Sequence, residues 1–423
     1  MQLNSVYRER QKKYDEFLPT LNYIFLKARY FGVSSFGLSV SFIWSLIIFL
    51  MLLILESFAL WKVVKLLAGW ATNTSNGHGM IGRLSGSIFY GNALLSLYLS
   101  SKFVNSWQQL SSHWLSIETT TGLRFPPDVR IKKRALLVTG FVGVCAVAEH
   151  MLSMMSATGF DIPPEEYFHR YIMSSHGFLL NPRNIWVGVP IFILSKIATV
   201  LWNFQDLIII LISMGLTSRY HRLNLYVNHA ITVERRFKGK QKFGTEFYVH
   251  IQVWRRIREA YVRQAKLVRM VDSKLGGLVL LSNVNNFYFI CLQLFLGIHK
   301  DKGSSINRCY YALSLGWLLI RACCVVLAAS DVHLHSQIAL KCLHTCPSSS
   351  YNVEMRRLQY QLTHDFVGLT AMGFFSLKRE LLLQVSSILL LVYQPLDVHC
   401  WTQITPKMAT TTSPASPKWN MTT

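Results

Sequence analysis

Charged residues are scarce in this chain of 423 residues. They make up 15% of it, hydrophobic residues make up 51%, and there are 21 acidic residues against 43 lysines and arginines. A disordered chain would have a higher fraction of charged residues. A soluble enzyme is also disfavoured, because it would expose too much of this apolar surface to water. The eight scattered cysteines also exclude a disulfide scaffold. The remaining class is a polytopic membrane protein, in which a net charge of +22 indicates basic cytoplasmic loops near anionic lipid rather than binding to nucleic acid.

Sequence motifs of catalysis are missing as well. The chain has no P-loop, no G-x-S-x-G elbow, no H-E-x-x-H and no G-x-G-x-x-G that follows a strand. His333, His335, Cys342, His344 and Cys346 are of the types that bind zinc, but their spacing matches no standard site, so solvated loop residues are the better interpretation. We therefore expect no catalytic residue, no metal, no cofactor and no enzyme activity.

Long apolar runs are what the sequence does contain, and about 20 apolar residues can cross a bilayer as a helix. Seven such runs occur, at residues 36–58, 82–103, 135–155, 186–216, 275–297, 311–330 and 381–392. Arg83, serines and glycines weaken the second run, and the seventh spans only if flanking residues extend it. The sequence predicts an all-α membrane protein with seven transmembrane helices.

The distribution of lysine and arginine predicts the orientation of these helices. If the N-terminus is cytoplasmic, the inner segments 1–35, 102–134, 217–274 and 331–380 hold 31 of these residues and the outer segments hold 10. In this orientation Asn73, the first residue of an Asn-Thr-Ser triplet, lies outside and is a predicted glycosylation site.

The second half of the inner segment 217–274 has the period of an amphipathic helix. Trp254, Ile257 and Tyr261 recur on one side of the predicted helix, and arginines occupy its other sides. This pattern leaves two interpretations open, because either a neighbouring span continues into the cytoplasm or a helix lies on the membrane surface.

Polar residues inside the predicted spans cost free energy in lipid and should face protein or water. Glu149, His150, Tyr288, Gln293 and Trp317 fall in the outer half of the bilayer. Such a set combines groups that bind sugar hydroxyls with aromatic faces on which sugar C–H groups rest. For any single residue, a polar contact between helices is an equally good explanation.

Five strings occur in order along residues 135–385. They are AEHMLS from Ala148, WNFQDL from Trp202 with the exit SRY from Ser218, WRRIREAYV from Trp254, LSNVNNFYFICLQLF from Leu281 and GLTAMGFFS from Gly368. In content, order and spacing they resemble insect gustatory receptors and, within these, the sugar-receptor clade.

The resemblance implies a subunit of a tetrameric, ligand-gated cation channel. Its N-terminus would be cytoplasmic, its seventh span would line the pore, and regions 217–274 and 331–380 would anchor the subunits to one another. It also implies mono- or disaccharides, membrane lipids and other gustatory receptor subunits as partners, no nucleic acid, and location in the plasma membrane of gustatory neurons.

Specific residues follow from this hypothesis. The sugar pocket in the outer half would be lined by Glu149, His150, Asn286, Tyr288, Gln293 and Trp317, and the pore by Ser387, Leu390 and Gln394. Arg321 is a candidate ion-pair partner for a buried carboxylate such as Glu149, a purely structural role.

The chain departs from the family at its end, because the T-Y…Q-F signature of the seventh span is absent. We therefore divide it into a cytoplasmic segment (1–35), a seven-helix domain (36–385), and an atypical span end with a disordered tail rich in Thr, Ser and Pro (386–423). The main hypothesis is a subunit of a sugar-gated, non-selective cation channel. The alternatives are a non-conducting partner in a heteromeric receptor and a solute transporter, although no internal repeat favours the latter.

Overall fold

The fold is almost entirely helical in the part of the chain that the structure describes. This computed structural model describes residues 16–35, 37, 39–70, 80–120, 128–159, 163–176, 188–237, 245–299, 305–346, 351–384 and 387. Within these ranges the one β feature is an isolated bridge between Thr370 and Ser376. The prediction of an all-α protein is confirmed for them.

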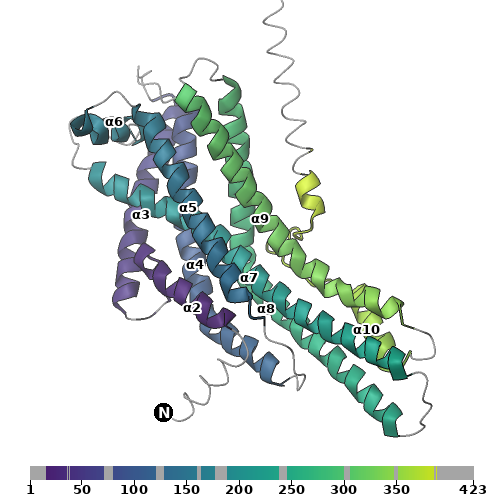
Figure 1. The fold of residues 1–423 in the computed structure, drawn as a ribbon. Helices are drawn as coiled ribbons and strands as arrows, with labels where there is room; N and C mark the ends of the chain where they lie inside the picture. Colours follow the sequence, from purple (N-terminus) through teal and green to yellow (C-terminus); the bar gives the residue numbers. More distant parts are fainter. Residues whose placement is uncertain are drawn as a thin grey trace, which may run out of the picture. The chain divides into compact units, whose positions relative to one another are not determined.

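The helices follow one another in a simple order (Figure 1). They are α2 (Phe17–Ala28), the 3-10 helix η1 (Arg29–Phe31), α3 (Val40–Leu67), α4 (Met80–Thr120), α5 (Ile131–Thr158), α6 (Pro164–His176), α7 (Gly188–Phe237), α8 (Thr245–His299), α9 (Ser305–His344) and α10 (Val353–His364).

Local sequence determines where several of these helices begin and end. Ser39 caps α3 by accepting a hydrogen bond from the Phe42 amide, and Asn352 caps α10 by accepting one from Met355. Gly159, with a φ of 79°, ends α5 in a conformation that residues with a side chain avoid.

Among the described residues, five helices are long and apolar enough to cross a membrane. They are Val40–Leu67, Ile131–Thr158, Gly188–Val233, Ile251–Phe295 and Cys309–His344, and they cover most of five of the seven predicted spans. The second predicted span lies in α4, which is helical but not among these five. Most of the seventh lies outside the described residues, so a count of seven spans stays a prediction.

Helix α7 is the central helix of this bundle, because it packs against α4, α5, α8 and α9. Helices α3 and α5 instead expose large apolar side chains, among them Ile54 and Val144. An apolar surface of this kind is stable where lipid covers it.

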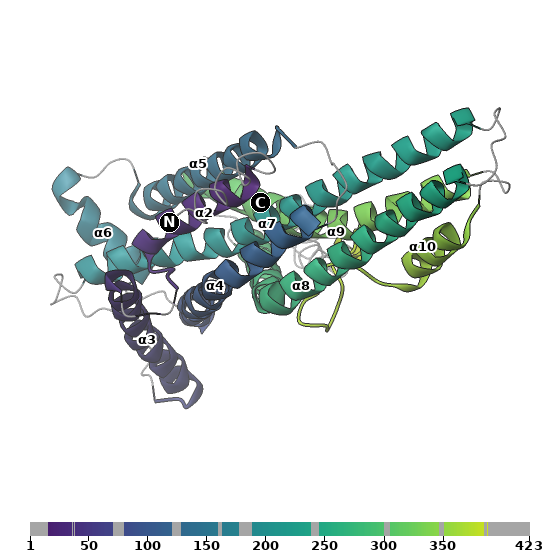
Figure 2. The ribbon, with the colours of Figure 1, turned by 90° about the horizontal axis from the view of Figure 1, so that it is seen from below.

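Helices α7, α8 and α9 continue side by side to one end, where α10 packs against α8 and α9 (Figure 2). Tyr261 on α8 donates to the Asn224 side chain on α7 (2.6 Å), and Asn224 donates to the His335 carbonyl on α9 (2.8 Å). Of the two interpretations of segment 217–274, the continuous helix is confirmed.

A tight turn follows α10 and coincides with the string that begins at Gly368. Met372 and Gly373 have positive φ angles, and Leu377 donates its amide to the Leu369 carbonyl (3.0 Å). Asp272 on α8 holds the turn by accepting from the amide (2.6 Å) and hydroxyl (2.8 Å) of Thr370. The turn is therefore held against α8 at Thr370. Residues 379–423 form a separate unit, of which 379–384 and 387 are described.

Candidate functional site

A small cavity of about 210 Å³ lies where α4, α5, α6, α7 and α9 meet. Its lining residues are Phe89, Glu149, His150, Ser153, Tyr171, Ser195, Thr199, Trp202, Asn203 and Tyr310. We call this the aromatic cavity, because four of its residues are aromatic and the others can form hydrogen bonds.

Helix α5 supplies two ionisable side chains to the aromatic cavity. Glu149 accepts a hydrogen bond from the Ser314 hydroxyl of α9 (2.9 Å). The Nε2 atom of His150 is buried and has no hydrogen-bond partner within the described ranges. Buried polar atoms in proteins are nearly always satisfied, so this atom is suited to a ligand hydroxyl or a water molecule.

Helix α6 supplies Tyr171, whose position is held by a lysine of α7. The Nζ atom of Lys196 donates to the Tyr171 hydroxyl (2.9 Å) and lies 4.8 Å from the centre of its ring. It also lies 4.4 Å from the centre of the Phe192 ring. These contacts keep the tyrosine at the edge of the cavity.

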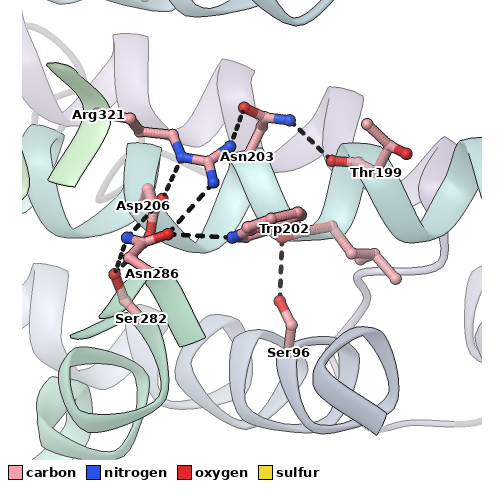
Figure 3. Close-up of polar contacts among 9 residues, drawn as sticks. Ser96, Thr199, Trp202, Asn203, Asp206, Ser282, Asn286 and Arg321 are labelled. Carbon is pink, nitrogen blue, oxygen red and sulfur yellow. Dashed lines mark hydrogen bonds and ion pairs between the residues drawn. The ribbon is translucent and has the colours of Figure 1, made fainter. Parts of the chain in front are cut away.

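A buried ion pair lies directly behind the aromatic cavity, between α7 and α9 (Figure 3). The Nε atom of Arg321 is 2.8 Å from Oδ2 of Asp206, and both side chains are at most 2% exposed. The Ser282 hydroxyl on α8 donates to the other oxygen of Asp206 (2.5 Å). A buried pair is stable only with such additional hydrogen bonds.

The same arginine reaches the aromatic cavity through Asn203, because its Nη1 donates to the Asn203 side chain (2.8 Å). Its guanidinium group also lies 4.5 Å from the centre of the Trp202 ring. Asn286 accepts from Trp202 Nε1 (3.2 Å) and from Arg321 Nη2 (3.2 Å). Trp202 and Asn203 of the cavity wall therefore belong to the same polar network as the buried ion pair.

The six residues predicted for the sugar pocket do not all line one cavity. Glu149 and His150 line the aromatic cavity. Asn286 lies behind it in the ion-pair network, and Gln293 is one contact away because it donates to Ser314 (3.3 Å). The remaining two are elsewhere, since Trp317 lines a larger groove and Tyr288 lines neither.

Three other predicted sites have separate outcomes. Leu390, Gln394 and Asn73 lie outside the described residues. Ser387 is described and exposed, and its hydroxyl donates to the Leu383 carbonyl (2.8 Å). Its role in a pore stays a prediction. Arg321 pairs with Asp206, whereas the sequence suggested Glu149 as an example of its partner.

Several cavity residues were not selected from the sequence. Ser195, Thr199, Trp202 and Asn203 recur at the spacing of one helical face, and that pattern could have identified them. Tyr171 had no comparable signal, because the short helix α6 lies outside every apolar run. Within the described ranges, no group of His, Cys, Asp and Glu side chains is arranged to hold a metal ion.

Comparisons with known proteins agree with the resemblance found in the sequence. A family model described as "Trehalose receptor" matches residues 33–394. The gustatory receptor for sugar taste 64a of Drosophila melanogaster is 29% identical over 315 residues, which cover 70% of this chain and 65% of that protein. The gustatory receptor 5a for trehalose of the same species is 28% identical over 313 residues, which cover 71% and 65%. The match therefore spans just under two thirds of the length of each of these two relatives.

Among solved structures, the chain is similar to the olfactory receptor OR5 of the insect Machilis hrabei in complex with eugenol. The TM-score is 0.61 at 12% sequence identity, and the alignment covers 89% of this chain and 96% of that one. At this identity the likeness shows a shared fold.

Proposed function

The chain belongs to the trehalose receptor family of gustatory receptors, and on that premise we propose that it is a subunit of a sugar-gated cation channel in the plasma membrane of taste neurons. Family membership places it among receptors rather than enzymes. We propose that it has seven spans and a cytoplasmic N-terminus, and that it forms a tetramer whose pore is lined by Ser387, Leu390 and Gln394.

The aromatic cavity is the observation that best supports a sugar ligand. The rings of Trp202 and Tyr310 suit the C–H faces of a sugar, and Glu149, His150 and Asn203 suit its hydroxyls. Its volume of about 210 Å³ is below the roughly 300 Å³ at which pockets for larger ligands begin. We propose that one sugar ring occupies the cavity and that a second ring, where present, extends from its mouth.

Gating requires that the sugar bind the open state more tightly than the closed state. Helix α9 is suited to couple sugar binding to opening, because it contributes Tyr310 to the cavity and Arg321 to the network behind it. Further along α9, His333 and Ser336 are hydrogen-bonded to the Val367 carbonyl, just before the turn that precedes the seventh span. A shift of α9 would thus be transmitted to the proposed pore helix.

The test is whole-cell current during perfusion with mono- and disaccharides, with surface labelling of the protein. Glu149→Gln should raise the half-maximal sugar concentration by about tenfold or more, because a hydrogen bond to a charged group contributes about 1.5–3 kcal/mol. The matched control is Glu56→Gln, which alters a carboxylate that accepts from Ser87 between α3 and α4 and does not line the cavity. Equal effects of the two variants would contradict the proposed site.

A non-conducting partner subunit is the second candidate, favoured by the absence of the T-Y…Q-F signature from the seventh span. It predicts surface protein without current when the chain is expressed alone, and current when another sugar receptor subunit is co-expressed. Replacing the residues from Ser386 with a T-Y…Q-F ending should then restore current to the chain alone. Current from the unaltered chain alone would exclude this candidate.

A further inference from the structure

Helices α5, α7 and α9 pack against one another (Figure 1). A long groove of about 900 Å³ lies between them. Along α9 it extends from Trp317 to His335, about 27 Å at 1.5 Å per residue. This length exceeds one leaflet of a hydrocarbon core about 30 Å thick. The groove is distinct from the aromatic cavity, and Arg321 lies between the two.

One end of the long groove is apolar and is exposed at the surface of the helix bundle. Phe141 and Ile320 line it and are each about half exposed. Val138, Met214 and Leu327 continue the apolar wall along the three helices. Side chains of this kind within a membrane-spanning bundle are covered by acyl chains or by another apolar surface.

The other end is basic. Arg130, Arg134 and Arg222 line it, and Lys133 joins them in an adjoining cavity of about 530 Å³ that shares Arg130 and Arg134. The carboxylates that line this end are Asp128 and Asp331, so the cations are in excess by two.

Asp128 already has partners of its own. It forms an ion pair with Arg134 (2.6 Å) and accepts a hydrogen bond from Ser218 (2.6 Å). The backbone amide of Arg130 donates to Asp128 (3.1 Å), but the side chains of Arg130 and Lys133 form no ion pair with a carboxylate among the described residues. These two cations are therefore the ones available to an external anion.

We propose that the long groove binds one anionic phospholipid, with its phosphate at Arg130 and Lys133 and an acyl chain along Val138, Met214 and Leu327. The basic end begins α5, in the segment whose charge predicts a cytoplasmic location, and the cytoplasmic leaflet is the one that holds anionic lipid. A sterol lacks the phosphate that the two cations would bind. A second copy of this chain could cover this end only by supplying carboxylates to both cations, because burying an unpaired charge is costly.

The experiment uses the full chain in lipid nanodiscs that contain a trace of photoactivatable phospholipid with the reactive group on its acyl chain. One probe has a phosphatidylserine headgroup and the other a phosphatidylcholine headgroup. After illumination, mass spectrometry locates the labelled peptides. The readout does not depend on ligand-gated current or on orientation, so its failure is separate from failure of the proposed channel function.

Peptides that contain Phe141 and Leu327 should be labelled more strongly by the phosphatidylserine probe. The double variant Arg130→Gln/Lys133→Gln should lower that labelling by about tenfold or more, because each basic residue near anionic lipid contributes on the order of fivefold in affinity. Lys132→Gln is the matched control, since Lys132 lies on the same turn but pairs with Glu16 and lines neither cavity.

A second pair of variants tests the apolar part of the groove. Ala328→Trp should fill the groove and reduce labelling by both probes, whereas Ala312→Trp, at an exposed position of α9 outside it, should not. Glycerophosphoserine, which has the headgroup without acyl chains, should not displace the phosphatidylserine probe. Equal labelling by the two probes, or labelling that the double variant leaves unchanged, would overturn the proposal.

Discussion

Helices α5 and α7 are equally apolar but have opposite surroundings. An 18-residue stretch of each helix has the same mean hydropathy of 1.8. In α7, 72% of that stretch is buried, whereas in α5 only 11% is buried. Hydropathy therefore identifies helices that can enter a membrane and does not show which of them is central.

Polar side chains account for the difference. Helix α7 carries Asp206, which is fully buried and is satisfied by Ser282 of α8 and Arg321 of α9. A buried polar group of this kind has to be surrounded by protein that can satisfy it. On α5, Gly140 and Gly143 face open space, and Val144 is 70% exposed. That face needs no protein partner because lipid can cover it.

The largest effect is expected from Asp206→Ala. It would leave Arg321 buried without its counter-charge, which costs about 3–5 kcal/mol. We expect a large fall in the apparent melting temperature of the detergent-solubilised protein, measured by size-exclusion chromatography after heating. Val144→Ala on α5 should change it little, and a similar fall for both variants would remove the distinction between the two helices.

The next largest effect on stability is expected when a glycine of α7 is replaced, compared with a glycine of α5. A Cβ atom at Gly215 on α7 would lie 2.4 Å from Cε1 of the buried Phe17 ring, whereas one at Gly143 on α5 would meet nothing within 4 Å. Gly215→Ala should destabilise the protein by about 1–3 kcal/mol through overpacking. Gly143→Ala should be neutral or should stabilise by up to about 1 kcal/mol through helix propensity.

The same heating assay applies to both glycine variants. Adding Phe17→Leu to Gly215→Ala should recover part of the loss, because the smaller side chain makes room for the new methyl group. A loss that persists unchanged in the double variant would show that the ring is not its cause.

A smaller, pH-dependent effect is expected where α8 meets α10, a short helix that is not among the five long and apolar enough to cross a membrane. A hydrogen bond from Arg258 (2.7 Å), with further attraction from Arg357, holds the pKa of Glu354 below its ordinary value of 4.5. The folded-state pKa is depressed, so this stabilisation is present above about pH 4.5 and is lost as the pH falls through the folded-state pKa. Melting curves of the wild type and Glu354→Gln should differ at pH 7 and converge in acid. A constant difference would contradict this account.

The smallest effect is expected at an exposed pair on α8. Glu259 lies within 3.2 Å of Arg255 and 3.7 Å of Arg263, and all three side chains are at least one-third exposed. Glu259→Gln should cost about 0.3–0.5 kcal/mol, and added salt should remove most of that difference. A cost as large as that of Asp206→Ala would mean that burial does not decide the strength of ion pairs in this protein.

The sequence by itself determined the class of the molecule and much of its local structure. Apolar runs near 20 residues require helices in lipid, and the period around Trp254 and Tyr261 indicated a helix. It left open whether that helix continues a span or lies on the membrane surface, and the structure shows the continuous helix α8. The strings from Ala148 to Ser376 identified the family, and they included Glu149 and His150, which line the aromatic cavity.

Only the tertiary structure decided which polar residues meet. Asp206, Ser282 and Arg321 come from three helices and form one buried network. Tyr288 and Trp317, which the sequence predicted for the sugar pocket, do not line the aromatic cavity. Tyr171 reaches that cavity from a helix with no apolar run. The physical reason is that residue spacing determines which side chains share a face of one helix. The rotation of that helix and the choice of its neighbours depend on packing among residues far apart in the chain.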